Sequence, residues 1–190
     1  MGKLIEKDGC FYSGAVKVPR LTEIIQSLGI VDYSSIPKKV RDFSMRRGTL
    51  SHRACELYDL GTLNEETLDP QLVPYLDGWK KAVSDLKLTF KHIEERLFNE
   101  TYWYTTCPDR IGLFDEVPCV VEIKSGKVQP WTALQLSAQA ACLPSDEVYL
   151  RIAIGLPGNG TYTKHFFTDR NDRNIILGGI SLYNWKNRNA

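Results

Sequence analysis

The sequence predicts an α/β (α+β) domain with a central mixed β-sheet flanked by helices. Apolar residues recur at intervals of three and four in the first part of the chain, as in amphipathic helices. After residue 101 the pattern changes to β-branched and aromatic runs, interrupted by one further helical segment. The chain has 190 residues, of which 43% are hydrophobic and 25% are charged, which is ordinary globular usage. A chain of this length has room for one core but hardly for a second one.

We therefore expect one domain over residues 1–190, in three parts. Residues 1–100 form a mainly helical N-terminal part. Residues 101–169 hold the main strands and one helix. Residues 170–190 form a C-terminal helix.

The helices of the N-terminal part are predicted from apolar spacing and from glycine and proline positions. The first helix ends at Gly29, which is typical of a C-cap, and a turn at Pro37 precedes the second. Gly48 separates the second helix from the third. The last segment is expected to be one long helix or a pair. The four segments cover 19–30, about 38–46, about 49–59 and 70–98.

The strands are predicted from runs of β-branched and aromatic residues between turns. The run at 101–106 and the segment 108–114 come first, and a turn at Asp115 leads to a strand over 117–124. We expect the last two of these to pair antiparallel. The elements that follow are a helix over 131–143, strands over 148–154 and 162–167, and a closing helix over 172–185.

The charge balance excludes binding of nucleic acid or lipid through the overall field of the protein. There are 24 basic and 23 acidic residues, a formal net charge of +1. A solvated helix face explains most local charge clusters, but one cluster here is dense enough to form a patch for a polyanion. Its members are Lys38, Lys39, Arg41, Arg46, Arg47 and Arg53.

Cysteine usage and hydropathy favour the cytoplasm. The five cysteines are an odd number without a C-x-x-C pair, which argues against a disulfide framework and a zinc knuckle. Charged residues near the start predict no signal peptide. No segment has the apolar length of a membrane span, so we expect no membrane partner.

A carboxylate pair and a lysine mark the candidate catalytic strands. Asp109 follows Pro108, and Glu122-Ile123-Lys124 lies thirteen residues later on the adjoining strand. Alternate residues of a strand share a face, so Glu122 and Lys124 are neighbours while Ile123 points to the opposite layer. Two carboxylates can hold Mg²⁺ or Mn²⁺, and an ammonium can orient water or neutralise charge during phosphoryl hydrolysis.

Two helices contribute further candidates. His52 and Glu56 are four residues apart, so they lie on one helix face. A histidine beside carboxylates favours manganese or a mixed metal preference. Gln135, in the helix after the Glu-Ile-Lys strand, could bind a phosphate or a water. Each feature alone is more often structural, and only their order and spacing indicate a site.

In that order, the residues resemble the PD-(D/E)xK nuclease superfamily, in particular its RecB-like branch with the phage exonucleases of the lambda type. The resemblance covers about residues 18–143 and implies a restriction-endonuclease-like core. The matching segments are 47–56, 108–112, 120–126 and 134–138.

The resemblance assigns roles to the candidates. Asp109 and Glu122 would be metal ligands together with the backbone carbonyl of Ile123, and His52 would be the additional ligand of the RecB-like branch. Lys124 would be the catalytic lysine. Glu56 would lie beside the ligands or bind a second ion. Gln135 matches the glutamine of the branch's Q-x-x-x-Y motif, but this chain has Gln139 where the branch has tyrosine, which puts that substrate contact in doubt.

The resemblance implies a metal-dependent deoxyribonuclease, an exonuclease on linear double-stranded DNA ends in phage-type recombination or DNA processing. Mg²⁺ or Mn²⁺ would be the cofactor, and the basic cluster would hold the DNA backbone with little sequence specificity. Branch members can form rings or act beside a single-strand annealing protein, so a homo-oligomer and such a protein are the partners to test.

The sequence also bears on other cofactors and on alternative activities. Some branch members carry an iron–sulfur cluster on four cysteines, but only Cys142 follows the core strands here, so we expect none. The chain has no Walker A loop, so we expect no nucleotide cofactor. A structure-specific or restriction-type endonuclease, a catalytically inactive DNA-binding module and RNA as the substrate remain open alternatives.

Overall fold

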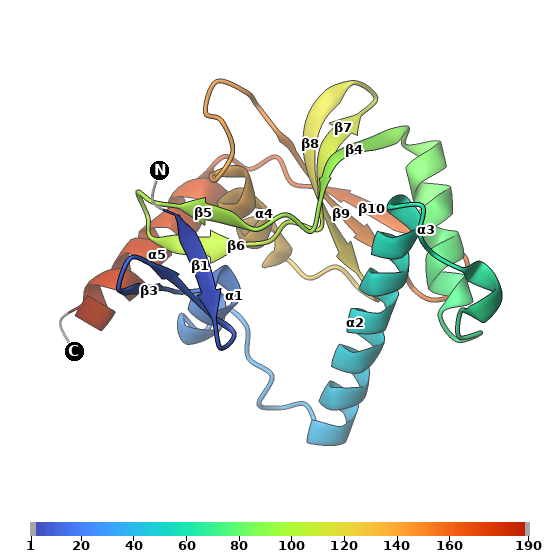
Figure 1. Ribbon diagram of the computed structural model, residues 1–190, viewed down its shortest axis with the longest axis horizontal. Coiled ribbons are helices and arrows are strands. Elements are labelled where there is room, and N and C mark those ends of the chain that lie inside the picture. The colour runs from blue at the N-terminus through green and yellow to red at the C-terminus, as the bar shows by residue number, and fades with distance from the viewer. Residues whose placement is uncertain (1–2, 189–190) are drawn as a thin grey trace.

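The structure, a computed structural model that describes residues 3–188, is built around a five-stranded mixed sheet (Figure 1). The strands lie in the order β10-β9-β8-β7-β4. The pair β8–β9 is parallel, and the other neighbouring pairs are antiparallel. The prediction of a mixed sheet flanked by helices is confirmed. The strands are β4 (Leu88–Ile93), β7 (Arg110–Phe114), β8 (Val117–Lys124), β9 (Leu150–Gly155) and β10 (Thr163–Phe166).

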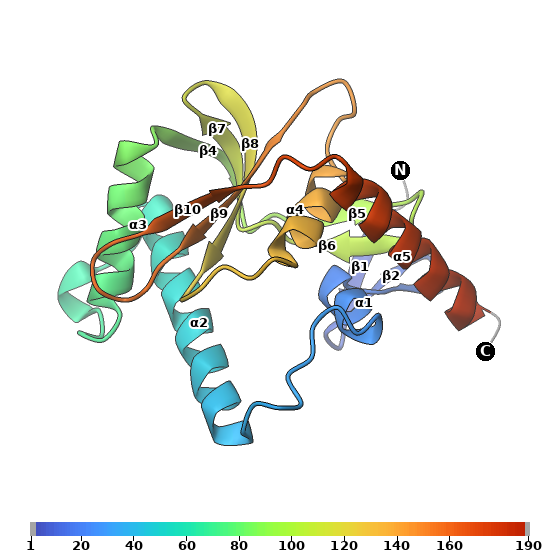
Figure 2. The same cartoon turned by 180° about the vertical axis from the view of Figure 1, so that it is seen from behind.

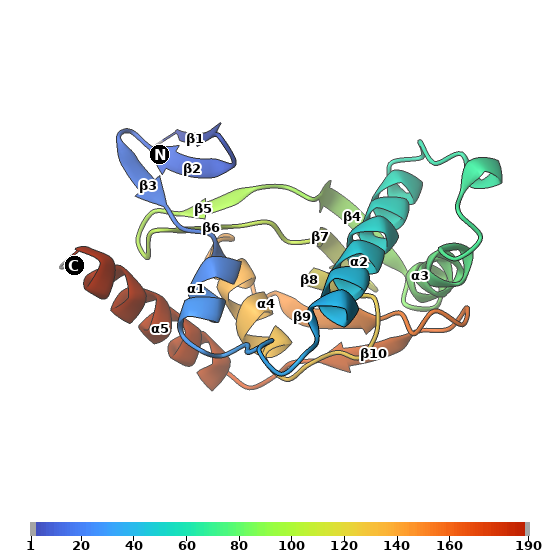
Figure 3. The ribbon, with the colours of Figure 1, turned by 90° about the horizontal axis from the view of Figure 1, so that it is seen from below.

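Helices cover both faces of this sheet (Figure 3). Trp79 of α3 and Cys55 of α2 belong to a core cluster with Val121 and Ile123 of β8. On the opposite face, Leu136 of α4 packs near Val120 of β8. Glu122 and Lys124 share the face of Val120, as strand alternation requires. The helices are α1 (Leu21–Ser27), α2 (Lys38–Asp59), α3 (Val73–Asp85), α4 (Thr132–Ala140) and α5 (Asn171–Arg188), with a short 3-10 helix, η1 (Glu65–Thr67).

A second group of elements lies beside the main sheet, away from α2 and α3 (Figure 2). Helices α1, α4 and α5 enclose a separate cluster that includes Ile24, Ala138, Ile176 and Tyr104. Two small antiparallel sheets, one of three strands and one of two, complete this part. Their strands are β1 (Leu4–Lys7), β2 (Cys10–Ser13), β3 (Val16–Val18), β5 (Leu97–Asn99) and β6 (Tyr104–Thr106). The sequence did not predict β1 to β3, because these strands are short and mostly exposed.

Helix α2 runs unbroken through Gly48, so the predicted division into two helices is wrong. A Cβ atom at Gly48 would lie 3.2 Å from Ser125 Oγ, which follows β8 directly. Glycine therefore serves close approach of the helix to the end of β8 rather than a turn. Its cost within a helix, about 0.5–1 kcal/mol, is one that packing of the second half of α2 can offset.

The prediction of helix throughout 70–98 is also wrong. Helix α3 ends at Asp85, Lys87 adopts a left-handed φ of 47°, and β4 begins at Leu88. β4 pairs with β7, where a Cβ atom at Gly112 would come within 1.9 Å of the Thr89 carbonyl oxygen. Pairing with a neighbour distant in the sequence thus overrides a helix-like apolar spacing.

The remaining elements agree with the sequence to within a few residues. β7 and β8 pair antiparallel as expected, with Arg110 opposite Val121 and Phe114 opposite Val117. The helix expected over 131–143 is α4, and the closing helix is α5. Within residues 3–188, none of the helices combines the length and the apolar character needed to cross a membrane.

Candidate functional site

The predicted catalytic strands meet at one end of the central sheet. Asp109 directly precedes β7. Glu122 and Lys124 lie within the last three residues of β8. Asp109 Oδ2 accepts a hydrogen bond of 2.6 Å from the backbone N–H of Ile123, which joins the two strands at this point. Asp109 and Glu122 are only 6% and 4% exposed, so their charges need partners.

Glu122 finds its partners on its own strand and on α4. Lys124 Nζ and Gln135 Nε2 donate to its Oε1 atom at 2.8 and 2.7 Å. Gln139 Nε2 donates to its Oε2 atom at 2.9 Å. Lys124 Nζ also donates to Gln135 Oε1 at 3.0 Å, so lysine and glutamine hold each other in place. One ammonium and two amides therefore satisfy both oxygens of this carboxylate.

Asp109 finds a different set of neighbours on the side of α2. His52 Nδ1 lies 3.4 Å from Asp109 Oδ1. Glu94, the residue after β4, donates its backbone N–H to the Asp109 carbonyl oxygen at 3.1 Å. His52, Glu94 and Asp109 each offer a ligand atom, and these atoms lie within 4.8 Å of one another. Glu122 is not a member of this group of three.

Crowded negative charge shifts the pKa values on this side. Burial, followed by the neighbouring Asp109 carboxylate, raises the pKa of Glu94 to about 7. Burial alone would lower the pKa of His52, but the Asp109 and Glu122 carboxylates outweigh it and raise that pKa to about 9. Burial opposes ionisation of Asp109, yet His52 and Lys124 hold its pKa below the ordinary value. The side of α2 thus brings two carboxylates together around one imidazole, whose positive charge depends on pH.

A buried arginine contacts residues on the α2 side of the site. Arg110 is fully buried, and its Nε atom lies 2.7 Å from Asp59 Oδ2 on α2. Its Nη1 atom lies 3.6 Å from Glu94 Oε1, and its guanidinium stands 5.6 Å from the centre of the Trp79 ring. Trp79 Nε1 also donates to Asp59 at 3.0 Å. This network fixes the strand that presents Asp109.

Sequence reasoning missed Glu94 and Arg110. Glu94 was placed inside an expected helix, far from the strands with Asp109. The available signal was the alternation of Leu88, Phe90 and His92 with polar residues, which indicates a strand ending just before Glu94. Arg110 is adjacent to Asp109, but only its burial shows that it is structural.

The other predicted site residues lie nearby with different contacts. Glu56 is on α2, where its carboxylate pairs with Arg53, and it lies outside the group of three. Its negative charge nevertheless contributes to the raised pKa of Glu94. The Ile123 side chain is fully buried against the opposite layer, as predicted. Gln139, to which no role was assigned from the sequence, is fully buried and contacts Glu122.

The predicted basic cluster lies along α2, whose first turns project from the rest of the molecule (Figures 1 and 2). Within residues 3–188, Lys38, Lys39, Arg41 and Arg46 have no ion pair or hydrogen-bond partner. Arg47 differs, because its guanidinium stands 5.9 Å from the Tyr75 ring centre. The side chains of these four cations are thus free to contact a polyanion. They lie on the projecting part of the helix.

The group of three fits a hard or borderline divalent cation. Mg²⁺ prefers oxygen ligands, which Asp109 and Glu94 offer, and the imidazole of His52 also suits Mn²⁺. The raised pKa of Glu94 reflects its partial burial and then repulsion from the buried Asp109 carboxylate, and a bound cation would relieve this repulsion.

Comparison with known proteins adds no family to this picture. No protein-family model matches the chain, and a search of curated proteins found no significant match.

Proposed function

We propose that the protein is a metal-dependent nuclease that hydrolyses phosphodiester bonds of DNA, acting on the ends of linear duplexes. The observation that carries this proposal is one end of a sheet where an aspartate, a glutamate, a lysine and a glutamine face an imidazole–carboxylate group. This is the residue set of the PD-(D/E)xK superfamily and its RecB-like branch, and it supports a restriction-endonuclease-like core.

In this proposal, the two sides of the site divide the work. His52, Glu94 and Asp109 would hold Mg²⁺ or Mn²⁺, and by the resemblance Glu122 and the Ile123 carbonyl would add ligands. A bound ion would polarise a phosphoryl oxygen and lower the pKa of a water molecule. Lys124, held between Glu122 and Gln135, would orient the attacking water and neutralise charge in the transition state.

The substrate would approach along α2. Its unpaired cations can contact phosphates without reading bases, so we expect low sequence specificity and strong salt dependence. Lys124 Nζ also stands 4.9 Å from the centre of the Trp131 ring, a cation–π contact that helps to hold the ammonium in position. Both features favour a backbone-directed reaction.

The test is degradation of end-labelled linear duplex with Mg²⁺ or Mn²⁺ by the wild-type protein and by the Lys124→Ala and Glu122→Ala variants. We expect each variant to lose about 10²–10⁴-fold in rate, the range for removal of a positioned acid–base or charge-stabilising group. Thermal melting of each variant checks that it folds. Full degradation by either variant would show that the site is assigned wrongly.

Two further substrates separate the alternatives. Covalently closed circular DNA stays intact with an exonuclease and is cut by an endonuclease of the same superfamily. End-labelled RNA tests the third possibility. A DNA-binding module without activity would bind duplex but degrade none of the three.

A further inference from the structure

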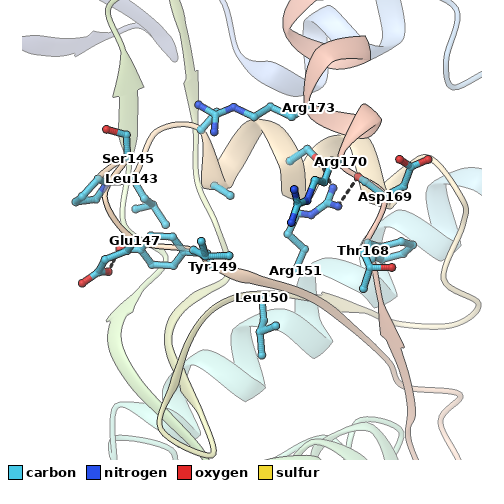
Figure 4. Close-up of a pocket in the computed structure, with 16 residues that line it drawn as sticks. Leu143, Ser145, Glu147, Tyr149, Leu150, Arg151, Thr168, Asp169, Arg170 and Arg173 are labelled. Atoms are coloured by element: carbon cyan, nitrogen blue, oxygen red, sulfur yellow. Dashed lines mark hydrogen bonds between the residues drawn. The ribbon is translucent and has the colours of Figure 1, made fainter.

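A pocket of about 510 Å³ lies outside the candidate active site (Figure 4). It is formed by α4, the start of β9 and the segment that leads into α5. β8 and β9 run parallel, with Cys119 opposite Leu150 and Lys124 opposite Gly155. Leu150 lines the pocket, so the pocket is at the end of the strand pair opposite to Lys124.

The acidic residues of this region are already satisfied within the chain. Asp172 pairs with Arg151 at 2.9 Å. Asp169 Oδ1 accepts a hydrogen bond of 2.9 Å from a backbone N–H at the start of α5. The Glu147 carboxylate accepts from the Tyr149 hydroxyl. Only Asp172 is neutralised, by Arg151. Asp169 and Glu147 accept hydrogen bonds from neutral donors and keep their negative charges beside the pocket.

Two cations of the pocket have no such partner. Arg170 and Arg173 lie at the beginning of α5 and line the pocket, and within residues 3–188 neither forms an ion pair or a hydrogen bond. Figure 4 shows both side chains on the same side of the pocket, across from Tyr149. The first backbone N–H groups of an 18-residue helix add partial positive charge at the same place.

One part of the remaining lining is apolar and partly aromatic. Leu143, Ala140 and Phe167 belong to or pack against one core cluster, together with Tyr149. Aromatic side chains offer faces on which a planar ring can stack. The pocket therefore offers a doubly cationic side and a ring-binding side within a volume typical of small-molecule sites, roughly 300–1,000 Å³.

We propose that this pocket binds a phosphorylated small molecule with a planar aromatic body, the chemical class of the nucleoside monophosphates. Arg170 and Arg173 would take the phosphate in charge-assisted hydrogen bonds, and the base would lie against Tyr149 and Phe167. The site is built from residues that play no part in the proposed nuclease chemistry, so it does not depend on that activity.

Binding is measured by calorimetry on the full chain in EDTA, so that metal-dependent binding at the active site is absent. The probes are deoxyadenosine 5′-monophosphate, inorganic phosphate and deoxyadenosine. We expect the nucleotide to bind more tightly than either part alone. The double variant Arg170→Gln, Arg173→Gln should bind it about tenfold or more weakly, as expected for loss of charged hydrogen bonds.

Two matched variants locate the site. Lys186→Gln with Arg188→Gln removes the same charge from the other end of α5 and should bind like the wild type. Glu122→Ala should also bind like the wild type, and the double arginine variant should keep any nuclease activity.

Three outcomes would overturn the proposal. The nucleotide could fail to bind, or bind equally well to the double arginine variant, in which case the pocket is not its site. Inorganic phosphate could bind as tightly as the nucleotide, which would leave no role for the ring-binding side. Because binding is read in EDTA, each of these results is independent of whether the protein cuts DNA.

Discussion

The two buried carboxylates of the site belong to neighbouring strands, but their negative charges have different partners. Glu122 is satisfied from within the chain by Lys124, Gln135 and Gln139. Asp109 shares its surroundings with Glu94, and its cationic neighbour on α2 is a histidine, whose charge depends on pH. The Glu122 carboxylate on the side of α4 thus needs no further partner. The carboxylates on the side of α2 are best balanced by an external cation.

Under the proposed function, this difference would separate positioning from metal binding. Charge-assisted hydrogen bonds to Glu122 fix one carboxylate and one ammonium in a set geometry before any ligand arrives. The excess of carboxylate on the side of α2 provides the attraction for a divalent ion.

Besides the Lys124→Ala and Glu122→Ala variants, the largest effect is expected for Asp109→Asn, on the side of α2. Asp109→Asn removes the charge that both His52 and a bound cation would contact. The rate of DNA degradation should therefore fall by about 10²–10³-fold or more. The Mg²⁺-induced rise in melting temperature should disappear with it. Asp115→Asn, in the exposed turn between β7 and β8, is the control and should leave both unchanged. An unchanged metal response in Asp109→Asn would refute the metal assignment.

A smaller effect is expected on the side of α4. Gln139→Leu removes one of the three donors to Glu122, and the rate should fall by about 10–100-fold, as for groups that orient a catalytic residue. Stability should fall less than a lost hydrogen bond suggests, because leucine also removes Gln139 Oε1, a buried acceptor without a partner among residues 3–188.

The measurements are initial rate and thermal unfolding, with Gln129→Leu before α4 as the control. A variant that loses stability but keeps its rate would show that Gln139 is only structural.

The pH dependence tests the charge states of Glu94 and His52 directly. The folded-state pKa values of Glu94, about 7, and His52, about 9, are raised above their ordinary values of 4.5 and 6.5. In the metal-free protein their contribution to stability is therefore present at low pH. It is lost for Glu94 as pH rises towards 7 and for His52 as pH rises towards 9.

Metal binding needs both groups deprotonated, so the Mg²⁺-induced rise in melting temperature should be larger at about pH 8.5 than at about pH 6. His52→Gln should flatten this dependence. A rise that is the same at both pH values would contradict the ligand assignment.

The smallest effect is expected where neither side is touched. Lys39→Gln with Arg46→Gln removes two unpaired cations from the projecting half of α2. Duplex affinity should fall a few-fold at moderate salt, and the slope of log affinity against log salt should decrease by about 1–2. The rate at saturating DNA should not change. Lys186→Gln with Arg188→Gln on α5 is the control, and equal losses in both would place the DNA elsewhere.

Local sequence patterns were enough to predict the main residues on the α4 side of the site. Strand alternation places Glu122 and Lys124 on one face, and the next helix brings Gln135 back over that face. Asp109 on the adjoining strand followed from the short turn between β7 and β8. The role of Gln139 was not predicted, because a hydrogen bond between α4 and β8 depends on how deeply the helix packs.

The side of α2 was only half predictable. His52 was identified by its spacing and by family resemblance. Glu94 was missed, because the segment before it has helix-like apolar spacing and becomes a strand only through pairing with β7. Gly48 was misread for a related reason, since its role is close approach to Ser125 and not a change of direction.

By itself, the sequence determined the class of the fold, most of its elements and the chemical types in the site, because periodicity and turn residues act over short distances. The tertiary structure alone decided which charges meet. It placed Glu94 beside Asp109, buried Arg110 beneath them, and left Arg170 and Arg173 unpaired over a pocket. Such contacts join residues far apart in the chain, and their energies depend on burial and distance, which no local pattern records.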